Sequence, residues 1–185
     1  MVIAIKVALF VAASGAIAWL SRRPLTDPRH HGFYRFFAWE AILALFLMNV
    51  DHWFADPFSP RQLAAWALLI VSLVLIVEGV RLLRGRGRPD QAREGDALLG
   101  IEKTTELVTT GAYRYIRHPF YASLLYLAWG ICLKQPGAVQ VALALVATGF
   151  LVATAKAEER ENIAYFGDAY RDYMTRTKMF IPLLF

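Results

Sequence analysis

The sequence predicts an all-α integral membrane protein with about five transmembrane helices, the last two forming a helical hairpin. Of its 185 residues, 57% are hydrophobic and only 19% are charged, whereas a soluble domain has roughly 45–50% apolar and about 25% charged residues. The apolar residues gather into five runs and show no barrel-like alternation, so each run is expected to be a helix whose backbone groups bond internally. This excludes a disordered chain. A soluble bundle is also excluded, because the run at 63–77 has no polar face.

The first three runs are long enough to cross a hydrocarbon core of about 30 Å at about 1.5 Å per residue. They cover residues 2–20, 32–50 and 63–83, with isolated polar side chains. No small-residue cleavage site follows the first run at 19–23, so it is expected to be a retained span and not a signal peptide. We therefore expect residues 1–83 to form an N-terminal part of three transmembrane helices.

The fourth and fifth runs, 119–133 and 138–155, are separated by the turn signal Gln135-Pro136-Gly137. Two apolar runs around such a turn favour an antiparallel hairpin, of which the first helix is short and is expected to start at the membrane interface. A linker rich in glycine and charge, 84–100, precedes them and lacks the third glycine of a dinucleotide-binding loop. Residues 84–185 are thus expected to form a C-terminal catalytic region of linker, motif loop, hairpin and cytoplasmic tail.

Basic residues set the expected orientation. They follow the first run at 22, 23, 29 and 35 and the third run at 81, 84, 86 and 88. Because cytoplasmic connections carry an excess of Lys and Arg, we expect the N-terminus outside and the C-terminus in the cytoplasm, in a bacterial-type inner membrane. The net charge of +5 is then explained by residues that face anionic lipid, and no nucleic acid is expected as a partner.

Metal binding is not predicted. The histidines are at 30, 31, 52 and 118, and no Cys or His pairs have ligand spacing. The single cysteine, Cys132, lies inside an apolar run and is interpreted as a packing residue.

Two polar clusters, 111–121 and 156–161, are predicted to meet at the cytoplasmic surface. His118 lies 18 residues before Pro136 and Glu158 lies 22 residues after it. Both therefore return to the same height, roughly 27 to 33 Å from the turn.

The chemistry of these clusters points to a zwitterionic, cationic ligand with a flat base. Pro119 suits the first turn of a helix, whose N-terminus together with Arg117 and His118 would seat a small anion such as a carboxylate. Aromatic faces nearby suit a purine or a cation, and the end of the fifth run supplies the carboxylates of Glu158 and Glu159. S-adenosylmethionine has all of the matching parts. The aromatic residues are Tyr113, Tyr115, Phe120 and Tyr121.

These residues carry a resemblance over roughly residues 100–185. The pattern is Gly111, Tyr113, Arg117-His118-Pro119 and Tyr121, followed by Glu158-Glu159, Phe166-Gly167, Tyr170, Tyr173 and Phe180-Ile181-Pro182. It resembles the isoprenylcysteine carboxyl methyltransferase family and its phospholipid N-methyltransferase relatives. The resemblance implies an integral-membrane methyltransferase that takes S-adenosylmethionine from the cytosol and methylates a lipophilic acceptor, either a prenylcysteine-like carboxylate or a lipid head group.

The resemblance also implies site residues. Arg117 is included because it would help to seat an anion at the helix N-terminus. The expected cofactor-binding residues are Thr105, Glu106, Leu107, Val108, Tyr113, Arg117, His118, Pro119, Phe120, Tyr121 and Glu158. Glu158 and Glu159 are the candidates for orienting the acceptor or removing its proton. On the substrate side, Thr154 occupies a position where the isoprenylcysteine enzymes resemble each other in having arginine, which argues against a prenylcysteine carboxylate as the acceptor.

Two alternatives remain open at this point. An NADPH-dependent enzyme similar to sterol reductases would resemble the C-terminal half, although Phe120 and Ala157-Glu158-Glu159 depart from that pattern. A non-catalytic membrane scaffold would keep its function when His118 or Glu158 is replaced, whereas a methyltransferase would lose cofactor binding.

Overall fold

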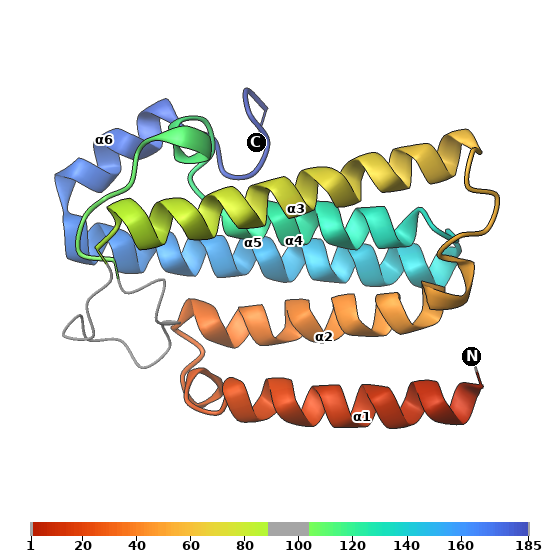
Figure 1. Cartoon of the computed structure of the whole chain (residues 1–185). Helices are drawn as coiled ribbons and strands as arrows, with labels where there is room; N and C mark the ends of the chain where they lie inside the picture. The colour runs from red at the N-terminus through yellow and green to blue at the C-terminus, as the bar shows by residue number, and fades with distance from the viewer. Residues whose placement is uncertain (1, 89–103, 185) are drawn as a thin grey trace.

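The computed structural model describes residues 2–88 and 104–184, and within them the chain is helical (Figure 1). The helices are α1 Ile3–Leu20, α2 His31–Asn49, α3 Pro60–Arg86, α4 Pro119–Cys132, α5 Ala138–Phe166 and α6 Asp168–Arg176. An isolated parallel β-bridge joins Ile116 and Lys178. The all-α prediction is confirmed. Most of the predicted linker 84–100 lies outside the described residues.

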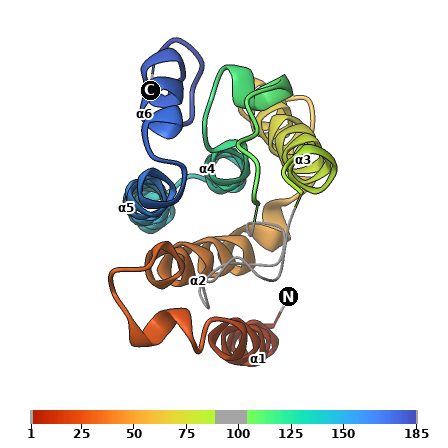
Figure 2. The same ribbon diagram turned by 90° about the vertical axis from the view of Figure 1, so that its left-hand side faces the viewer.

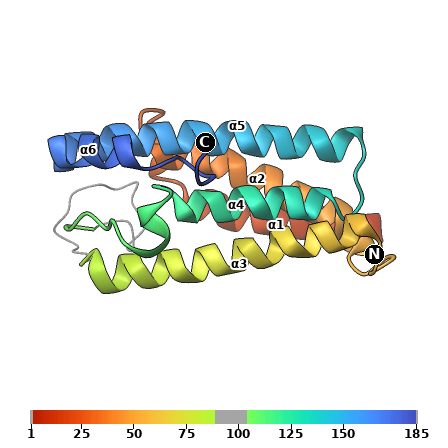
Figure 3. The same cartoon turned by 90° about the horizontal axis from the view of Figure 1, so that it is seen from above.

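The five long helices run along one another in an elongated bundle. Seen from its end, α4 lies between α3 and α5, α2 lies beside them, and α1 is outermost (Figures 2 and 3). The connection from α1 to α2, the end of α3, the start of α4 and α6 lie at one end of the bundle, whereas the α4–α5 turn lies at the other (Figure 1). Both predicted polar clusters therefore belong to the same end.

Four helices are long and apolar enough to cross a membrane. They are α1, α2 with its continuation to His52, α3 and α5. The fourth predicted run forms α4, which has 14 residues. At about 1.5 Å per residue α4 is about 21 Å long, less than the ~30 Å hydrocarbon core. Length and composition therefore support four spans, and the predicted fourth run is the short helix of the bundle.

Small side chains let α2, α4 and α5 approach closely. Ala38, Ala122 and Ala155 are fully buried in one core cluster, and Ala128 and Ala144 in a second. Large apolar side chains such as Leu73 and Leu145 are instead more than half exposed, and α1 has no buried residue at all. This distribution, with small residues at helix contacts and large apolar residues outward, is typical of helices packed in lipid.

The end of α4 is capped by side chains from its neighbours. The side-chain amide of Asn49 donates to the Ile131 carbonyl at 2.7 Å, and Arg61 donates to the Leu133 carbonyl at 2.8 Å. The ammonium group of the fully buried Lys134 donates to Gln62 at 3.0 Å. Asn49 and Arg61 thus donate to carbonyls at the end of α4, and the positive charges of Arg61 and Lys134 oppose the negative end of the α4 dipole.

Candidate functional site

The site begins with the loop that leads into α4. A 3-10 turn, Gly111–Arg114, starts it, and Pro119 is the first residue of α4. Gly111 has a φ of +61°, and a Cβ there would lie 2.6 Å from Leu82 Cδ1 and 2.7 Å from Glu78 Oε1. The Glu78 carboxylate also accepts the backbone N–H of Ala112 at 3.0 Å. The left-handed φ favours glycine at the first position of the loop, and a larger residue there would also displace the side chains of Leu82 and Glu78.

The C-terminal tail holds the same loop from the other side. The backbone N–H of Arg117 donates to the Lys178 carbonyl at 2.8 Å, and the N–H of Lys178 donates to the Tyr115 carbonyl at 3.0 Å. The Tyr173 hydroxyl on α6 donates to the Tyr113 carbonyl at 2.6 Å. The position of the motif loop thus depends on contacts with residues about 60 positions later.

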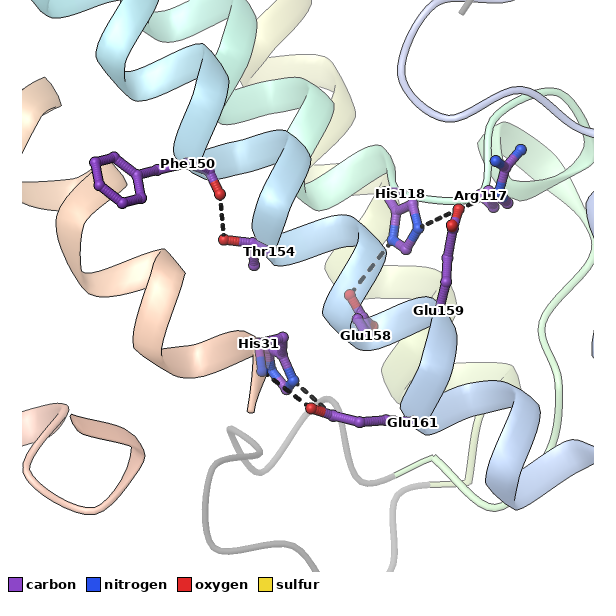
Figure 4. Close-up of polar contacts among 8 residues, drawn as sticks. All are labelled: His31, Arg117, His118, Phe150, Thr154, Glu158, Glu159 and Glu161. Carbon is purple, nitrogen blue, oxygen red and sulfur yellow. Dashed lines mark hydrogen bonds and ion pairs between the residues drawn. The ribbon is translucent and has the colours of Figure 1, made fainter. Parts of the chain in front are cut away.

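A compact charge cluster follows at the start of α4 (Figure 4). The imidazole of His118 is 4% exposed, with Nδ1 3.3 Å from Glu158 Oε2 and Nε2 3.3 Å from Glu159 Oε1. Glu159 also accepts from Arg117 Nε at 2.5 Å, and the Arg117 guanidinium donates to the Thr177 carbonyl at 2.6 Å. The two polar clusters of the sequence therefore meet, as the count from Pro136 predicts.

The cluster favours a protonated histidine. Burial opposes the charge on His118, but hydrogen bonds with Glu158 and Glu159 outweigh it and raise the pKa of the imidazole above its ordinary value. With a carboxylate at each ring nitrogen, both nitrogens act as donors. Two cations, Arg117 and His118, then face two carboxylates. Their charges are directed mainly at Glu158 and Glu159, and the group of four carries no net charge.

A pocket of about 610 Å³, including its open mouth, lies against this cluster. One wall is polar and contains Glu158 and Asn162, and the others are largely aromatic. The full lining comprises Leu83, Thr104, Leu107, Val108, Tyr113, Arg117, His118, Phe120, Tyr121, Glu158, Asn162, Phe166, Tyr170 and Tyr173. Burial raises the pKa of Tyr170 and of Tyr173, so both hydroxyls stay neutral and can donate.

Eight predicted site residues line this pocket together. They are Leu107, Val108, Tyr113, Arg117, His118, Phe120, Tyr121 and Glu158.

The other predicted residues lie outside the lining. Glu106 is exposed and pairs with Arg88 at 2.8 Å, and the Thr105 hydroxyl donates to the carbonyl of the same arginine at 2.9 Å. Pro119 is buried as the first residue of α4. Glu159 contacts the pocket only through Arg117 and His118. Thr154, on α5, is fully buried and donates to the Phe150 carbonyl at 2.7 Å (Figure 4).

Several lining residues were not among the predicted site residues. Asn162 and Phe166 follow Glu158 at intervals of four on α5, so helical spacing was the signal that could have found them. Tyr170 and Tyr173 belong to the pattern that carries the family resemblance, without an assigned role. Leu83 and Thr104 come from α3 and from the segment before the motif loop, and nothing local in the sequence marks them.

A second polar contact at this end ties α2 to α5. The buried His31 places Nδ1 2.7 Å from Glu161 Oε2, and its backbone N–H donates to the same carboxylate at 3.0 Å (Figure 4). Within residues 2–88 and 104–184, no group of three or more His, Cys, Asp or Glu side chains is placed to hold a metal ion.

Comparison with known proteins assigns the family. Residues 60–169, from the start of α3 to the start of α6, match the family described as phospholipid methyltransferase. The chain belongs to the phospholipid methyltransferase family. The match covers most of the residues that build the pocket, including the charge cluster.

Among individual family relatives, methanethiol S-methyltransferase from Mycobacterium tuberculosis is 33% identical over 70 residues, which are 38% of this chain and 28% of the relative. Methanethiol S-methyltransferase 1 from Bradyrhizobium diazoefficiens is 34% identical over 86 residues, 46% of this chain and 30% of the relative. Protein-S-isoprenylcysteine O-methyltransferase from Schizosaccharomyces pombe is 34% identical over 79 residues, 42% of this chain and 34% of the relative. The chain thus matches only about a third or less of the length of these relatives. No solved structure matches it.

Proposed function

We propose that this protein is an integral-membrane methyltransferase that binds S-adenosylmethionine in the pocket at the start of α4 and methylates a lipophilic acceptor. The observation that carries the proposal is the joining of the Glu158–His118 pair with aromatic walls in one pocket at the end of an apolar bundle. Family membership supports it, and so do the relatives that are named methyltransferases.

The chemistry of the lining fits the proposed cofactor. S-adenosylmethionine carries an ammonium, a sulfonium, a carboxylate, ribose hydroxyls and a flat purine. Glu158 presents negative charge to the cationic groups, and Asn162 offers both a donor and an acceptor to hydroxyls. The rings of Phe166 and Tyr170, 6.5 Å apart and nearly parallel, form part of a wall suited to a purine face.

The chemistry that S-adenosylmethionine supplies when bound is a methyl group already activated by its sulfonium. The residues of the chain then need to orient the acceptor and to exclude water. These two effects supply most of the acceleration in such transfers. The bound group would give up this methyl group as the acceptor atom forms a bond to its carbon, and the electron pair of the broken carbon–sulfur bond would remain on sulfur. A carboxylate acceptor needs no base. An amine or thiol acceptor gives up a proton, for which Glu158 is the candidate base because it lines the pocket.

Glu159 takes a different role in this proposal. Its carboxylate is held by Arg117 and His118 and is only 8% exposed, so it is a positioning residue and not the base. By fixing the imidazolium, it fixes the ring that faces Glu158.

The membrane arrangement is part of the proposal. We place the pocket at the cytoplasmic face of a bacterial-type inner membrane, with the N-terminus outside and α4 and α5 as a helical hairpin. The connections with the most arginine, after α1 and at the end of α3, lie at the same end as the pocket, which supports this orientation (Figure 1).

The acceptor is proposed by class. The relatives are named for methanethiol and for isoprenylcysteine, and both names describe small or lipophilic sulfur compounds. Residue 154 is threonine, so no arginine at this position can pair with a prenylcysteine carboxylate. We therefore also propose a lipophilic thiol or a lipid head group as the methyl acceptor.

Calorimetry of the purified protein tests the cofactor. We expect saturable binding of S-adenosylmethionine that Glu158→Gln weakens at least tenfold and that the control Asp172→Asn, at an exposed residue outside the pocket lining, leaves unchanged. Absence of binding, or equal loss in both variants, would overturn the proposal. Labelled S-adenosylmethionine offered with prenylcysteine, methanethiol and extracted membrane lipids then identifies the acceptor. Oxidation of NADPH with a sterol, without methyl transfer, would support the reductase alternative. Unchanged function in the Glu158 variant would support the scaffold alternative.

A further inference from the structure

Two adjoining hollows beside the motif loop, together called the groove here, have Arg114 in common. Its apolar part, about 790 Å³ with its open mouth, is lined by α3, the loop and the tail, with Leu75, Ile116 and Pro182 among its residues. Its polar part, about 890 Å³, lies between the loop and α6. Arg114 lines both parts, and its side chain is exposed, so the two parts lie next to each other around it.

The polar part is cationic. It is lined by Arg114, Arg176 and three threonines, and its lining contains no acidic side chain. Arg86, at the end of α3, donates to the hydroxyl of Thr110 in the same lining at 2.6 Å. In the apolar part the only acid is Glu78, whose carboxylate accepts the Ala112 N–H. The groove therefore has one apolar end and one end that attracts an anion.

The groove is aligned with the expected membrane normal. Leu75 and Arg86 lie on the same helix, α3, which is long enough to span a membrane. They are 11 residues apart, so Leu75 of the apolar lining and Arg86, which bonds to Thr110 of the polar lining, are separated by about 16 Å along α3. Arg86 is the last residue of α3, and this end of α3 lies at the same end of the bundle as α6 (Figure 1). A phospholipid in the leaflet has this same order of acyl chain and phosphate.

We propose that this groove binds an anionic phospholipid from the surrounding leaflet, with an acyl chain along Leu75, Ile116 and Pro182 and the phosphate between Arg114 and Arg176. Arginine pairs with phosphate through two parallel hydrogen bonds, and basic pockets beside spans are suited to anionic head groups. The lipid lies outside the cofactor pocket, because the Tyr173 ring lines both spaces and its hydroxyl is bonded to the Tyr113 carbonyl. It is a bound accessory lipid and not the methyl acceptor, so this inference goes beyond the proposed function.

Native mass spectrometry of the full chain, reconstituted with phosphatidylglycerol or phosphatidylcholine, tests the proposal. We expect retention of phosphatidylglycerol in preference. The double variant Arg114→Gln and Arg176→Gln is expected to weaken its binding by about 25-fold, about fivefold for each arginine, and each single variant is measured as well. Both side chains are exposed, so packing is unaffected. The matched control is Arg171→Gln, also an exposed arginine on α6, which pairs with Asp168 and lines neither part of the groove.

Three results would overturn the inference. Equal retention of the two lipids would remove the preference for an anion. An equal loss with Arg171→Gln would assign the effect to general surface charge. Complete displacement by inorganic phosphate alone, as effective as a full lipid, would show that the apolar part is not used. Calorimetry of the double variant with S-adenosylmethionine separates this inference from the proposed function, since cofactor binding is expected to be unchanged.

Discussion

Replacing Glu159 by glutamine tests whether the charge cluster holds the site together. In the structure one oxygen of Glu159 accepts from Arg117 at 2.5 Å and lies 3.3 Å from His118 Nε2. Glutamine keeps the shape but leaves two buried cations facing one carboxylate. A hydrogen bond to a charged group contributes about 1.5–3 kcal/mol, and loss of one partner of a buried pair costs about 3–5 kcal/mol. We expect Glu159→Gln to lower the free energy of unfolding by about 3 kcal/mol.

The same variant should change the pH dependence of stability. Because the folded-state pKa of His118 is raised, its contribution to stability is fully present below the ordinary value of 6.5 and is lost as pH rises through the folded-state pKa. Without the Glu159 charge that pKa falls, so the contribution of His118 to stability is smaller and its loss is complete at a lower pH.

Unfolding in detergent, followed by tryptophan fluorescence from about pH 5 to about pH 9, measures both effects. Glu106→Gln is the control, because its exposed pair with Arg88 should change stability by less than about 1 kcal/mol. A Glu159→Gln protein as stable as the wild type, with the same pH profile, would refute the reasoning.

Three further substitutions give distinct results. Gly111→Ala places a Cβ 2.6–2.7 Å from α3 side chains at a φ of +61°, so we expect a loss of about 2–4 kcal/mol in unfolding experiments and weaker cofactor binding in calorimetry; a fully stable variant would contradict the close packing. Tyr173→Phe removes the 2.6 Å hydrogen bond to the Tyr113 carbonyl, and a decrease of about 1 kcal/mol with a several-fold rise in the Kd for S-adenosylmethionine is expected. Asn49→Ala removes the 2.7 Å hydrogen bond to the Ile131 carbonyl, which still accepts the Lys134 N–H, so we expect a loss of about 1 kcal/mol in unfolding experiments and an unchanged cofactor affinity, because the contact lies at the opposite end of the bundle.

The helices and the meeting of the two polar clusters were predictable from local rules. Apolar runs identify helices in a membrane, and the rise per residue placed His118 beside Glu158 without any knowledge of tertiary structure. Counting along a helix does not, however, show where a side chain points. The partner of Arg117 was therefore not predicted to be Glu159, although both residues were singled out.

Other features depend on packing between distant segments. The contact of Lys178 with Tyr115 joins two irregular segments that have no periodic pattern, so no local rule finds it. Leu83 on α3 lines the pocket together with Tyr113 of the motif loop, and this meeting of two distant segments has no local signal in the sequence. The short length of α4 was predicted, because its apolar run is shorter than the first three. The side chains that donate to the end of α4 come from α2 and α3 and were not predicted.

The pairing of the tail with the motif loop has a consequence for how the protein is made. Residues 177–179 are synthesised after every helix of the described bundle, and their backbone fixes the segment that carries Arg117 and His118. The apolar helices can thus insert and pack one after another as they leave the ribosome, while the ligand pocket takes its final form only when this late segment arrives. Insertion into the membrane and acquisition of binding are therefore separate steps of biogenesis, and a chain interrupted before Thr177 is inserted but cannot complete the pocket.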